Sequence, residues 1–242
     1  MQGITYKIKH IGRTLPTGVT KASACTMQAI LKFNSNESPH CVYNEYVAIR
    51  LAQTLHIPAA DGVLTVAGAG LAYASIEIGS IGLDIPNLTA PRIKKVVSEY
   101  PEHCAALLAF DLFIGNWDRK QNIKASLKQP HIKIFCGFDH SHALLNIEED
   151  PTTSIKRLSS GELIVRHHPF YQKLWAADLW PWVERITHLP TCYIEEACQQ
   201  QVFSSSVSEL LQAELAAALV HRQQKMRQII EGNRNVILGN ML

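Results

Sequence analysis

Short stretches of strand-like sequence dominate the first eighty residues of the chain. Residues 4–11 predict a short strand, and residues 27–33 place apolar side chains at every second position, as strands with two unlike faces do. Two further apolar runs, residues 62–66 and 71–78, are joined by Ala-Gly-Ala-Gly and predict a β-hairpin. Residues 41–55 instead have helical spacing, which the sequence His-Ile-Pro then closes. We therefore expect an antiparallel sheet accompanied by one helix.

The remainder of the chain is mainly helical. Residues 79–91 contain two glycines and two prolines, which is typical of a connection between lobes. A helix is predicted from Pro101 to Gly115, and a short hairpin within residues 122–138. A capping box at Ser206–Glu209 predicts the start of a long helix that ends at Gly232.

The amino-acid composition is that of an ordinary globular protein. Of the 242 residues, 47% are hydrophobic and 18% are charged, and the formal net charge is only +2. Neither nucleic acid nor an anionic membrane is therefore expected as a partner. No apolar run reaches the roughly 18 residues of a membrane span, and the first residues lack the apolar core of a signal peptide. The six cysteines form no CxxC motif, which favours reduced thiols in a cytoplasmic protein over disulfides or zinc.

One lysine stands in an otherwise apolar predicted strand. Lys32 lies in the run Ala-Ile-Leu-Lys-Phe, where an ammonium group is costly to bury without a negative partner. The following helix offers such a partner, because Glu45 shares its apolar face with Val42 and Ile49. An inward-facing pair of Lys32 and Glu45 would hold the ammonium group where it can meet the α- and β-phosphates of ATP. The alternative is an edge-strand lysine that faces water.

The segment Gly-Asn-Trp-Asp-Arg-Lys-Gln-Asn, residues 115–122, follows a predicted helix and precedes a hairpin. Catalytic groups often lie on such loops between rigid elements. Asp118 would accept a hydrogen bond from an attacking hydroxyl group, and Lys120 would neutralise charge on the transferring phosphoryl group. Asn122 offers a neutral oxygen ligand to Mg²⁺. The alternative is a turn in which these residues have a structural role.

A second acidic residue, Asp139, follows directly after a predicted strand in which every second residue from Ile132 to Phe138 is apolar. Packing does not explain a carboxylate at this position, and we expect it to bind Mg²⁺ against nucleotide phosphates. His140 and His142 come next, but two histidines without a third matching ligand are a weak indication of zinc. The tryptophans of residues 174–182 are expected to belong to the core of the helical part.

The loop before Lys32 is where a cover for the phosphates is expected. It contains a single glycine, Gly18, and no GxGxxG motif. The hydroxyl groups of Thr17, Thr20 and Ser23, or their backbone N–H groups, are candidates for contact with phosphate, and Gly18 is counted with Thr20 among the candidate nucleotide-binding residues.

The order of these features resembles the protein-kinase-like fold, and most closely that of the HipA-like kinases. The matching parts are the strand with Lys32, the helix with Glu45, and the two segments that end in Asp118 and Asp139. The resemblance implies an α+β fold with an N-terminal nucleotide-binding lobe, residues 1–80, and a helical catalytic lobe, residues 81–242. It also implies ATP and Mg²⁺ as cofactors, and a hinge over residues 75–79.

By the same resemblance, Lys32 and Glu45 bind ATP, Asp118 is the catalytic aspartate, and Asn122 and Asp139 are the metal ligands. Glu77 falls in the hinge that would meet adenine. Asn122 lies four residues after Asp118, whereas the related families place that asparagine five residues after.

The expected activity is phosphoryl transfer to Ser or Thr of an unidentified protein substrate. The alternative is a pseudokinase that binds nucleotide or a partner protein without transfer, and a kinase of a small molecule or lipid head group is a third reading. An inhibitory partner protein is a further expectation.

Overall fold

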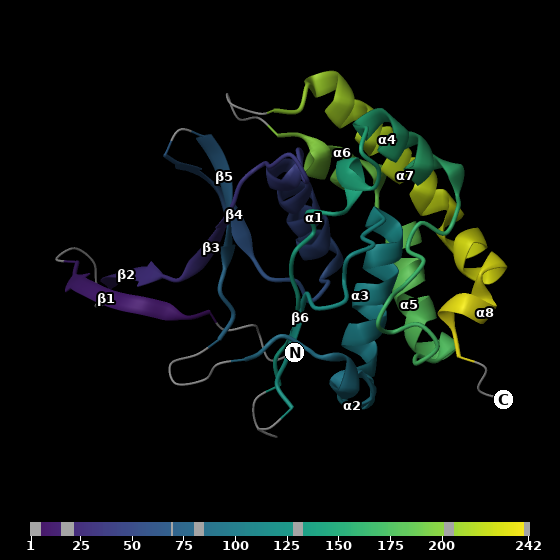
Figure 1. The fold of residues 1–242 in the computed structure, drawn as a ribbon, viewed down its shortest axis with the longest axis horizontal. Coiled ribbons are helices and arrows are strands. Elements are labelled where there is room, and N and C mark those ends of the chain that lie inside the picture. The colour runs from purple at the N-terminus through teal and green to yellow at the C-terminus, as the bar shows by residue number, and fades with distance from the viewer. Residues whose placement is uncertain are drawn as a thin grey trace.

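The computed structural model describes residues 6–15, 22–68, 70–79, 85–127, 133–200 and 206–239. Three candidate phosphate-binding residues, Thr17, Gly18 and Thr20, lie outside the described residues, as does the predicted turn at Lys128–Pro130. Figure 1 shows strands β1 to β5 on one side of the molecule, the other helices on the opposite side, and α1 between them. This is the two-lobed α+β arrangement that the sequence predicted.

In the described part of the N-terminal lobe the strands are β1 (Ile8–Thr14), β2 (Ser23–Met27), β3 (Ala29–Lys32), β4 (Gly62–Ala67) and β5 (Gly70–Ile76). β1 and β2 form an antiparallel hairpin that projects from the body of the protein (Figure 1). The other three form an antiparallel sheet in the order β3-β5-β4. Its register places Lys32 opposite the buried Tyr73, so both side chains lie on the same face.

The sequence predicted one strand over residues 27–33, and this was wrong, because the structure divides the stretch at Gln28. The Gln28 N–H donates to the carbonyl oxygen of Lys7 at 3.1 Å, and its carbonyl oxygen accepts from the N–H of Glu77 at 2.9 Å. Gln28 is therefore the point at which the chain passes from β2 to β3. β1 also continues to Thr14, beyond the predicted end at residue 11.

The predicted helix of the N-terminal lobe is confirmed as α1 (Cys41–Leu55). It packs against β4 and β5 on one side and against the helical lobe on the other. His56 ends it in the left-handed conformation, with φ 56°, and donates its N–H to the carbonyl oxygens of Ala52 and Gln53. The sequence His-Ile-Pro thus marks the end of the helix, as expected.

The helical lobe comprises η1 (Ala90–Arg92), α2 (Ile93–Glu99), α3 (Pro101–Ile114), η2 (Leu144–Asn146), α4 (Pro151–Ser160), α5 (Ala176–Thr187), α6 (Thr191–Cys198), α7 (Glu209–Gly232) and α8 (Arg234–Ile237). α3 lies at its centre, and every side chain from Cys104 to Ile114 is buried. A helix without a polar face is one that protein surrounds on all sides. As predicted, α3 starts at Pro101, and Gly115 follows it in the left-handed conformation.

The predicted hairpin is confirmed as the antiparallel pair β6 (Ile123–Ala125) and β7 (Phe135–Gly137). β7 also binds the segment after α1. The Ala60 N–H donates to the carbonyl oxygen of Gly137, and the Gly137 N–H donates to that of Pro58, both at 2.8 Å. The strand that leads to Asp139 is thus attached to both lobes.

Two predictions about the C-terminal half need correction. The cap of α7 is Ser208 rather than Ser206, because the Ser208 hydroxyl oxygen accepts the N–H of Leu211 at 3.3 Å. The helix does end at Gly232. Of the tryptophans assigned to the core, Trp182 is buried, but Trp175 is 52% exposed because it lies at the start of α5.

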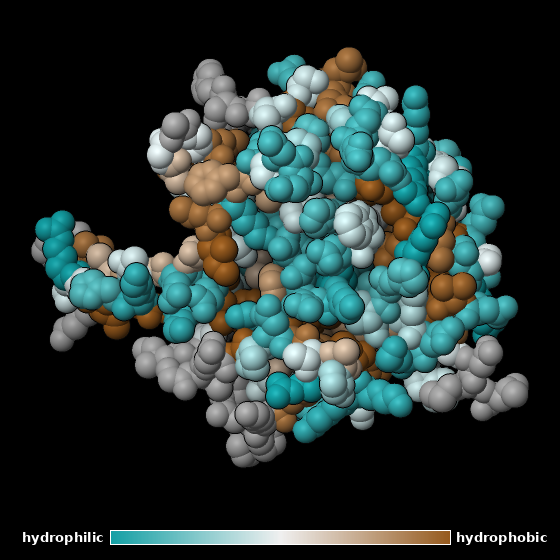
Figure 2. Space-filling model, viewed as in Figure 1, coloured by the Kyte–Doolittle hydropathy of each residue, from teal (hydrophilic) through white to brown (hydrophobic). Residues whose placement is uncertain are grey.

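Most of the core is one cluster that includes residues of α1, α3, α5 and α7. A second, smaller cluster joins the lobes through Ala60, Ile78, Ile85, Ile134 and Cys136. Figure 2 shows hydrophobic side chains at the surface of the N-terminal sheets, where Leu31, Val63 and Val66 are exposed. In the described ranges, no helix is both long enough and apolar enough to cross a membrane.

Candidate active site

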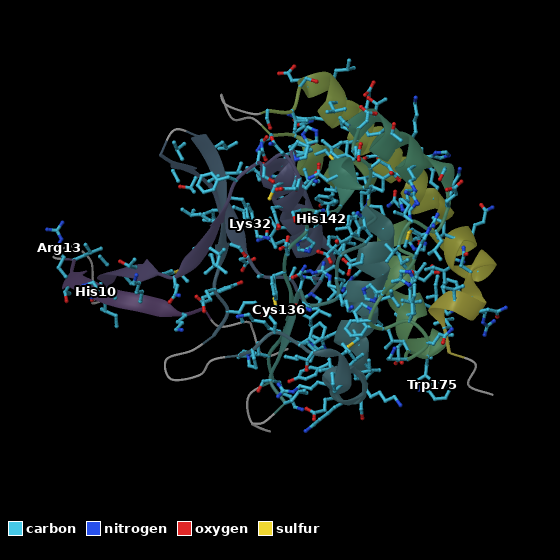
Figure 3. The ribbon with its side chains drawn as sticks, in the orientation of Figure 1. His10, Arg13, Lys32, Cys136, His142 and Trp175 are labelled. Carbon is cyan, nitrogen blue, oxygen red and sulfur yellow. The ribbon has the colours of Figure 1, made fainter. Side chains whose placement is uncertain are left out.

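Lys32 lies where the two lobes meet and contacts two carboxylates. Its Nζ is 2.6 Å from Oε1 of Glu45 on α1 and 2.9 Å from Oδ1 of Asp139, which follows β7. Figure 3 labels Lys32 between the N-terminal sheet and α1. The predicted inward-facing pair of Lys32 and Glu45 is therefore confirmed, and the structure adds Asp139 as the third member.

The charges of this triad stabilise one another. Burial favours the neutral form of Lys32, but Glu45 and Asp139 outweigh it and leave the lysine pKa above its ordinary value. Burial also opposes ionisation of Glu45, yet the hydrogen bond from His140 and the charge of Lys32 lower its pKa. Against the same effect of burial, Lys32 and the hydrogen bonds from Ser141 hold the pKa of Asp139 well below its usual range. All three groups are thus charged at neutral pH.

Asp139 is held in an uncommon conformation, with φ 63° in the left-handed region. Its Oδ1 accepts from the Ser141 hydroxyl at 2.7 Å and from the Ser141 N–H at 3.3 Å, in addition to the contact with Lys32. Within the described part of the chain, Oδ2 has no protein partner. One carboxylate oxygen of Asp139 therefore remains available to a ligand.

His140 supports Glu45 from the other side. Its N–H donates to Oε1 of Glu45 at 2.8 Å, and its ring Nδ1 is 3.4 Å from Oε2. The His140 ring is buried and packs edge-on against Phe110. His142 does not join it, but lies against the ring of Trp117. In the described part of the chain, no group of three or more His, Cys, Asp or Glu side chains is arranged to hold a metal ion.

The loop of residues 115–122 lies beside the segment that carries Asp139. The Phe138 N–H donates to the carbonyl oxygen of Asn122 at 3.0 Å, and Nδ2 of Asn122 donates to the carbonyl oxygen of Asp118 at 2.8 Å. These bonds leave Oδ1 of Asn122 and the carboxylate of Asp118 without a protein partner among the described residues. Lys120 is exposed at the surface of the same loop. The predicted metal-binding and catalytic residues thus lie on two adjoining loops.

Arg119 joins these loops and is almost completely buried, and it was not predicted from the sequence. Its Nε and Nη2 donate to both carboxylate oxygens of Asp111, at 2.7 and 2.8 Å. Its Nη1 donates to the carbonyl oxygens of Asn122, at 3.1 Å, and Phe138. One guanidinium group therefore connects α3, the loop of Asp118 and the residue before Asp139. Arg119 thus sets the position of the candidate active-site loops.

Asp111 accepts from two further groups. The side-chain amide of Asn116 donates to its Oδ1 at 3.1 Å, and Nε2 of His168 lies 3.0 Å from its Oδ2. The Phe170 N–H donates to Nδ1 of His168, so the ring proton of the neutral imidazole is on Nε2 and is donated to Asp111. Burial lowers the pKa of His168. Burial alone would raise the pKa of Asp111, but Arg119 and His168 bring it well below the usual range.

Glu77 has a different environment from the triad. Its carboxylate lies 3.9 Å from Nζ of Lys7. Its N–H donates to the carbonyl oxygen of Gln28, and its carbonyl oxygen accepts from the N–H of Lys7. The main chain of Glu77 thus belongs to the junction of β1, β2 and β3, and its predicted contact with adenine stays a prediction.

No protein-family model and no curated protein matches the chain. Several solved structures are similar to it. HipA of Shewanella oneidensis MR-1, in complex with HipB and its operator DNA, has a TM-score of 0.56 and 14% identity over 89% of this chain. The chain spans 62% of HipA, less than two thirds of its length. The Helicobacter pylori proinflammatory kinase CtkA has a TM-score of 0.59 and 13% identity, over 95% of this chain and 96% of CtkA. The chain therefore has a HipA-like kinase fold.

Proposed function

We propose that this chain is an ATP- and Mg²⁺-dependent phosphotransferase that acts on Ser or Thr hydroxyl groups of a protein. The observation that carries the proposal is the position of Lys32, whose ammonium group lies between Glu45 and Asp139 where the two lobes meet. A fixed ammonium group beside a metal-binding carboxylate is the arrangement that protein kinases use for nucleotide phosphates.

The residues present fit a magnesium ion. Mg²⁺ prefers hard oxygen ligands and is commonly held by one or two protein groups together with phosphates and water. Oδ2 of Asp139 and Oδ1 of Asn122 are oxygens of this kind, and neither has a protein partner in the described ranges. Mg²⁺, when bound, would neutralise charge on the phosphates of ATP. Nδ2 of Asn122 donates to the carbonyl oxygen of Asp118 at 2.8 Å, which leaves its Oδ1 for the ion although only four residues separate Asp118 and Asn122.

The protein's own groups would then position the reactants. Lys32 would donate to the α- and β-phosphates, and Glu45 would keep the ammonium group in place. Asp118 would accept the hydrogen bond of the acceptor hydroxyl and orient its oxygen toward the γ-phosphorus. Lys120, on the same exposed loop, would neutralise negative charge on the transferring group.

The comparisons support a proposal about partners. CtkA is named as a kinase, and HipA is found with the protein HipB and operator DNA. We extend to this chain only a protein substrate and an inhibitory partner protein. A location in the cytoplasm completes the proposal, and no direct contact with nucleic acid is included.

The proposal is tested with γ-labelled ATP and Mg²⁺ on purified protein. Wild type should transfer label to itself or to an added protein acceptor, whereas Asp139→Asn should not. Glu195→Gln is the matched control, because Glu195 is an exposed acid on α6. Equal transfer by wild type and Asp139→Asn would contradict the proposal.

A second candidate is a pseudokinase that binds nucleotide or a partner without transfer. The observation in its favour is the direct contact of Lys32 with Asp139, because this contact occupies one carboxylate oxygen of the candidate metal ligand. It predicts an ATP-dependent rise in melting temperature without any labelled product.

A further inference from the structure

An aromatic pair, one exposed ring and one half-buried ring, lies next to the candidate catalytic residue. Trp117 directly precedes Asp118 and is 46% exposed. Its ring centroid is 4.9 Å from that of His142, with 46° between the ring planes. The two rings come from different loops, one carrying Asp118 and the other carrying Asp139. We call Trp117 and His142 the aromatic platform.

Hydrogen bonds of the neighbouring residues hold the loop of Trp117 in place. On one side of Trp117, the buried Asn116 donates to Asp111, and on the other side Arg119 makes its bonds to Asp111 and Phe138. The platform therefore offers an aromatic surface in a preset position.

The loop of His142 is fixed as well. The carbonyl oxygen of the preceding residue, Ser141, accepts from the side chains of Ser38, Asn44 and Asn146, at 2.8 to 3.2 Å. An exposed aromatic surface that is already ordered binds a ligand without the cost of ordering it first.

We propose that the aromatic platform receives an apolar or aromatic side chain of the protein acceptor. The inference rests on the proposed function, because Asp118 must orient the acceptor hydroxyl for the platform to lie beside it. Consecutive Cα atoms are about 3.8 Å apart. A side chain that packs on Trp117 while the hydroxyl meets Asp118 would therefore come from within about two residues of the acceptor Ser or Thr.

The charges next to Trp117 are of both signs, so they do not select a charged side chain. An acidic side chain would be repelled by Asp118, the residue after Trp117, and a basic one by the exposed Lys120 of the same loop. A tryptophan face does attract cations. Asp118 would add to this attraction and Lys120, three residues after Trp117, would oppose it, so a basic side chain is the alternative that a peptide scan must include. An apolar or aromatic side chain gains free energy by covering the exposed ring whatever the balance of these charges.

The test is a positional scan of Ser/Thr peptides that vary one flanking residue at a time. Wild type should prefer Phe, Leu, Met or Trp at one position within two residues of the acceptor. Trp117→Ala should reduce kcat/KM for the preferred peptides about tenfold or more, through KM rather than kcat. His142→Ala should weaken the same preference by a smaller factor.

Trp175→Ala is the matched control, because Trp175 is also exposed but lies at the far end of the helical lobe from His142 (Figure 3). This variant should keep the wild-type preference. If Trp117→Ala retains the preference, or lowers kcat equally for every peptide, the ring has no role in acceptor recognition.

Hydrolysis of ATP and labelling of the protein itself, measured in parallel, separate the two proposals. Wild type that turns over ATP or labels itself, but phosphorylates no peptide or shows no apolar preference, overturns the platform and leaves the phosphotransferase standing. Absence of any ATP turnover overturns both.

Discussion

The ammonium nitrogen of Lys32 lies 2.9 Å from a carboxylate oxygen of Asp139, and this contact joins strand β3 of one lobe to the loop after β7 in the other. Glu45 holds the same nitrogen from α1 at 2.6 Å. The ammonium group is therefore held in position before any phosphate binds, because α1 and the loop after β7 fix it independently.

Replacement of Lys32 by Met should abolish most phosphoryl transfer. The variant removes the only proposed cationic contact to the α- and β-phosphates from the N-terminal sheet, and kcat/KM for ATP should fall roughly 100-fold or more. It also leaves the buried Glu45 without its ammonium partner, so the melting temperature should fall. Lys94→Met, at an exposed lysine on α2, is the control and should behave as wild type. Unchanged kinetics in Lys32→Met would remove this lysine from the site.

Replacement of Arg119 by Met should be strongly destabilising. The change leaves the carboxylate of Asp111 buried without its bidentate partner, and loss of one member of a buried pair costs about 3–5 kcal/mol. Denaturant unfolding of Arg119→Met, Asp111→Asn and the double variant measures the coupling. The double variant should be clearly more stable than the sum of the two single effects predicts. Simple additivity would mean that the pair does not act as a unit.

His168 should make stability depend on pH. Its pKa is lowered in the folded protein, while in the unfolded chain it lies near the ordinary value of about 6.5. Below about pH 7 the unfolded chain therefore binds a proton that the folded protein does not, and the free energy of unfolding falls as the pH is lowered toward 5. His168→Gln should flatten this slope. An identical slope for the variant and wild type, in urea unfolding between pH 5 and 7, would contradict the assignment.

Gly115 should tolerate no side chain. Its φ of 71° is in the left-handed region, and an added Cβ would lie 2.6 Å from Cδ1 of Ile147. Gly115→Ala should cost roughly 1–3 kcal/mol of stability. Ile147→Val removes the clashing atom, so the double variant should recover part of the loss.

Gly232→Ala is the control for this experiment, because no atom lies within 4 Å of the position where its Cβ would be. It should be neutral or slightly stabilising in thermal unfolding, since alanine is the better helix former. Equal melting temperatures of Gly115→Ala and wild type would show that the loop accommodates the methyl group.

Much of the fold and of the triad could be predicted because local pattern and chemistry agreed. Helical spacing in residues 41–55 placed Glu45 on the buried face, and a lysine in an apolar strand required a negative partner. The alternation before Asp139 placed that residue at the end of a strand. Each of these predictions depended on a few neighbouring residues and one simple periodicity.

What could not be predicted depends on contacts between distant segments. The break at Gln28 comes from hydrogen bonds to Lys7 and Glu77, which no local pattern indicates. The pair of Asp111 and Arg119 was missed, although a carboxylate in the apolar stretch Ala-Leu-Leu-Ala-Phe-Asp-Leu-Phe was a signal that a buried cation must lie nearby. The contribution of His168 to this pair required the fold of residues 163–171 to be known.

The central claim is that Asp139 binds the metal-nucleotide complex, while Asp118 orients the hydroxyl group of the acceptor. The most direct measurement is calorimetric titration of Mg²⁺ and ATP into wild type, Asp139→Asn and Asp118→Asn. Asp139→Asn should weaken binding at least about tenfold, because it removes a charged ligand of the ion. Asp118→Asn should bind as wild type does, since it loses only a contact to the acceptor. Equal affinity of wild type and Asp139→Asn, or loss of binding in Asp118→Asn, would contradict this division of roles.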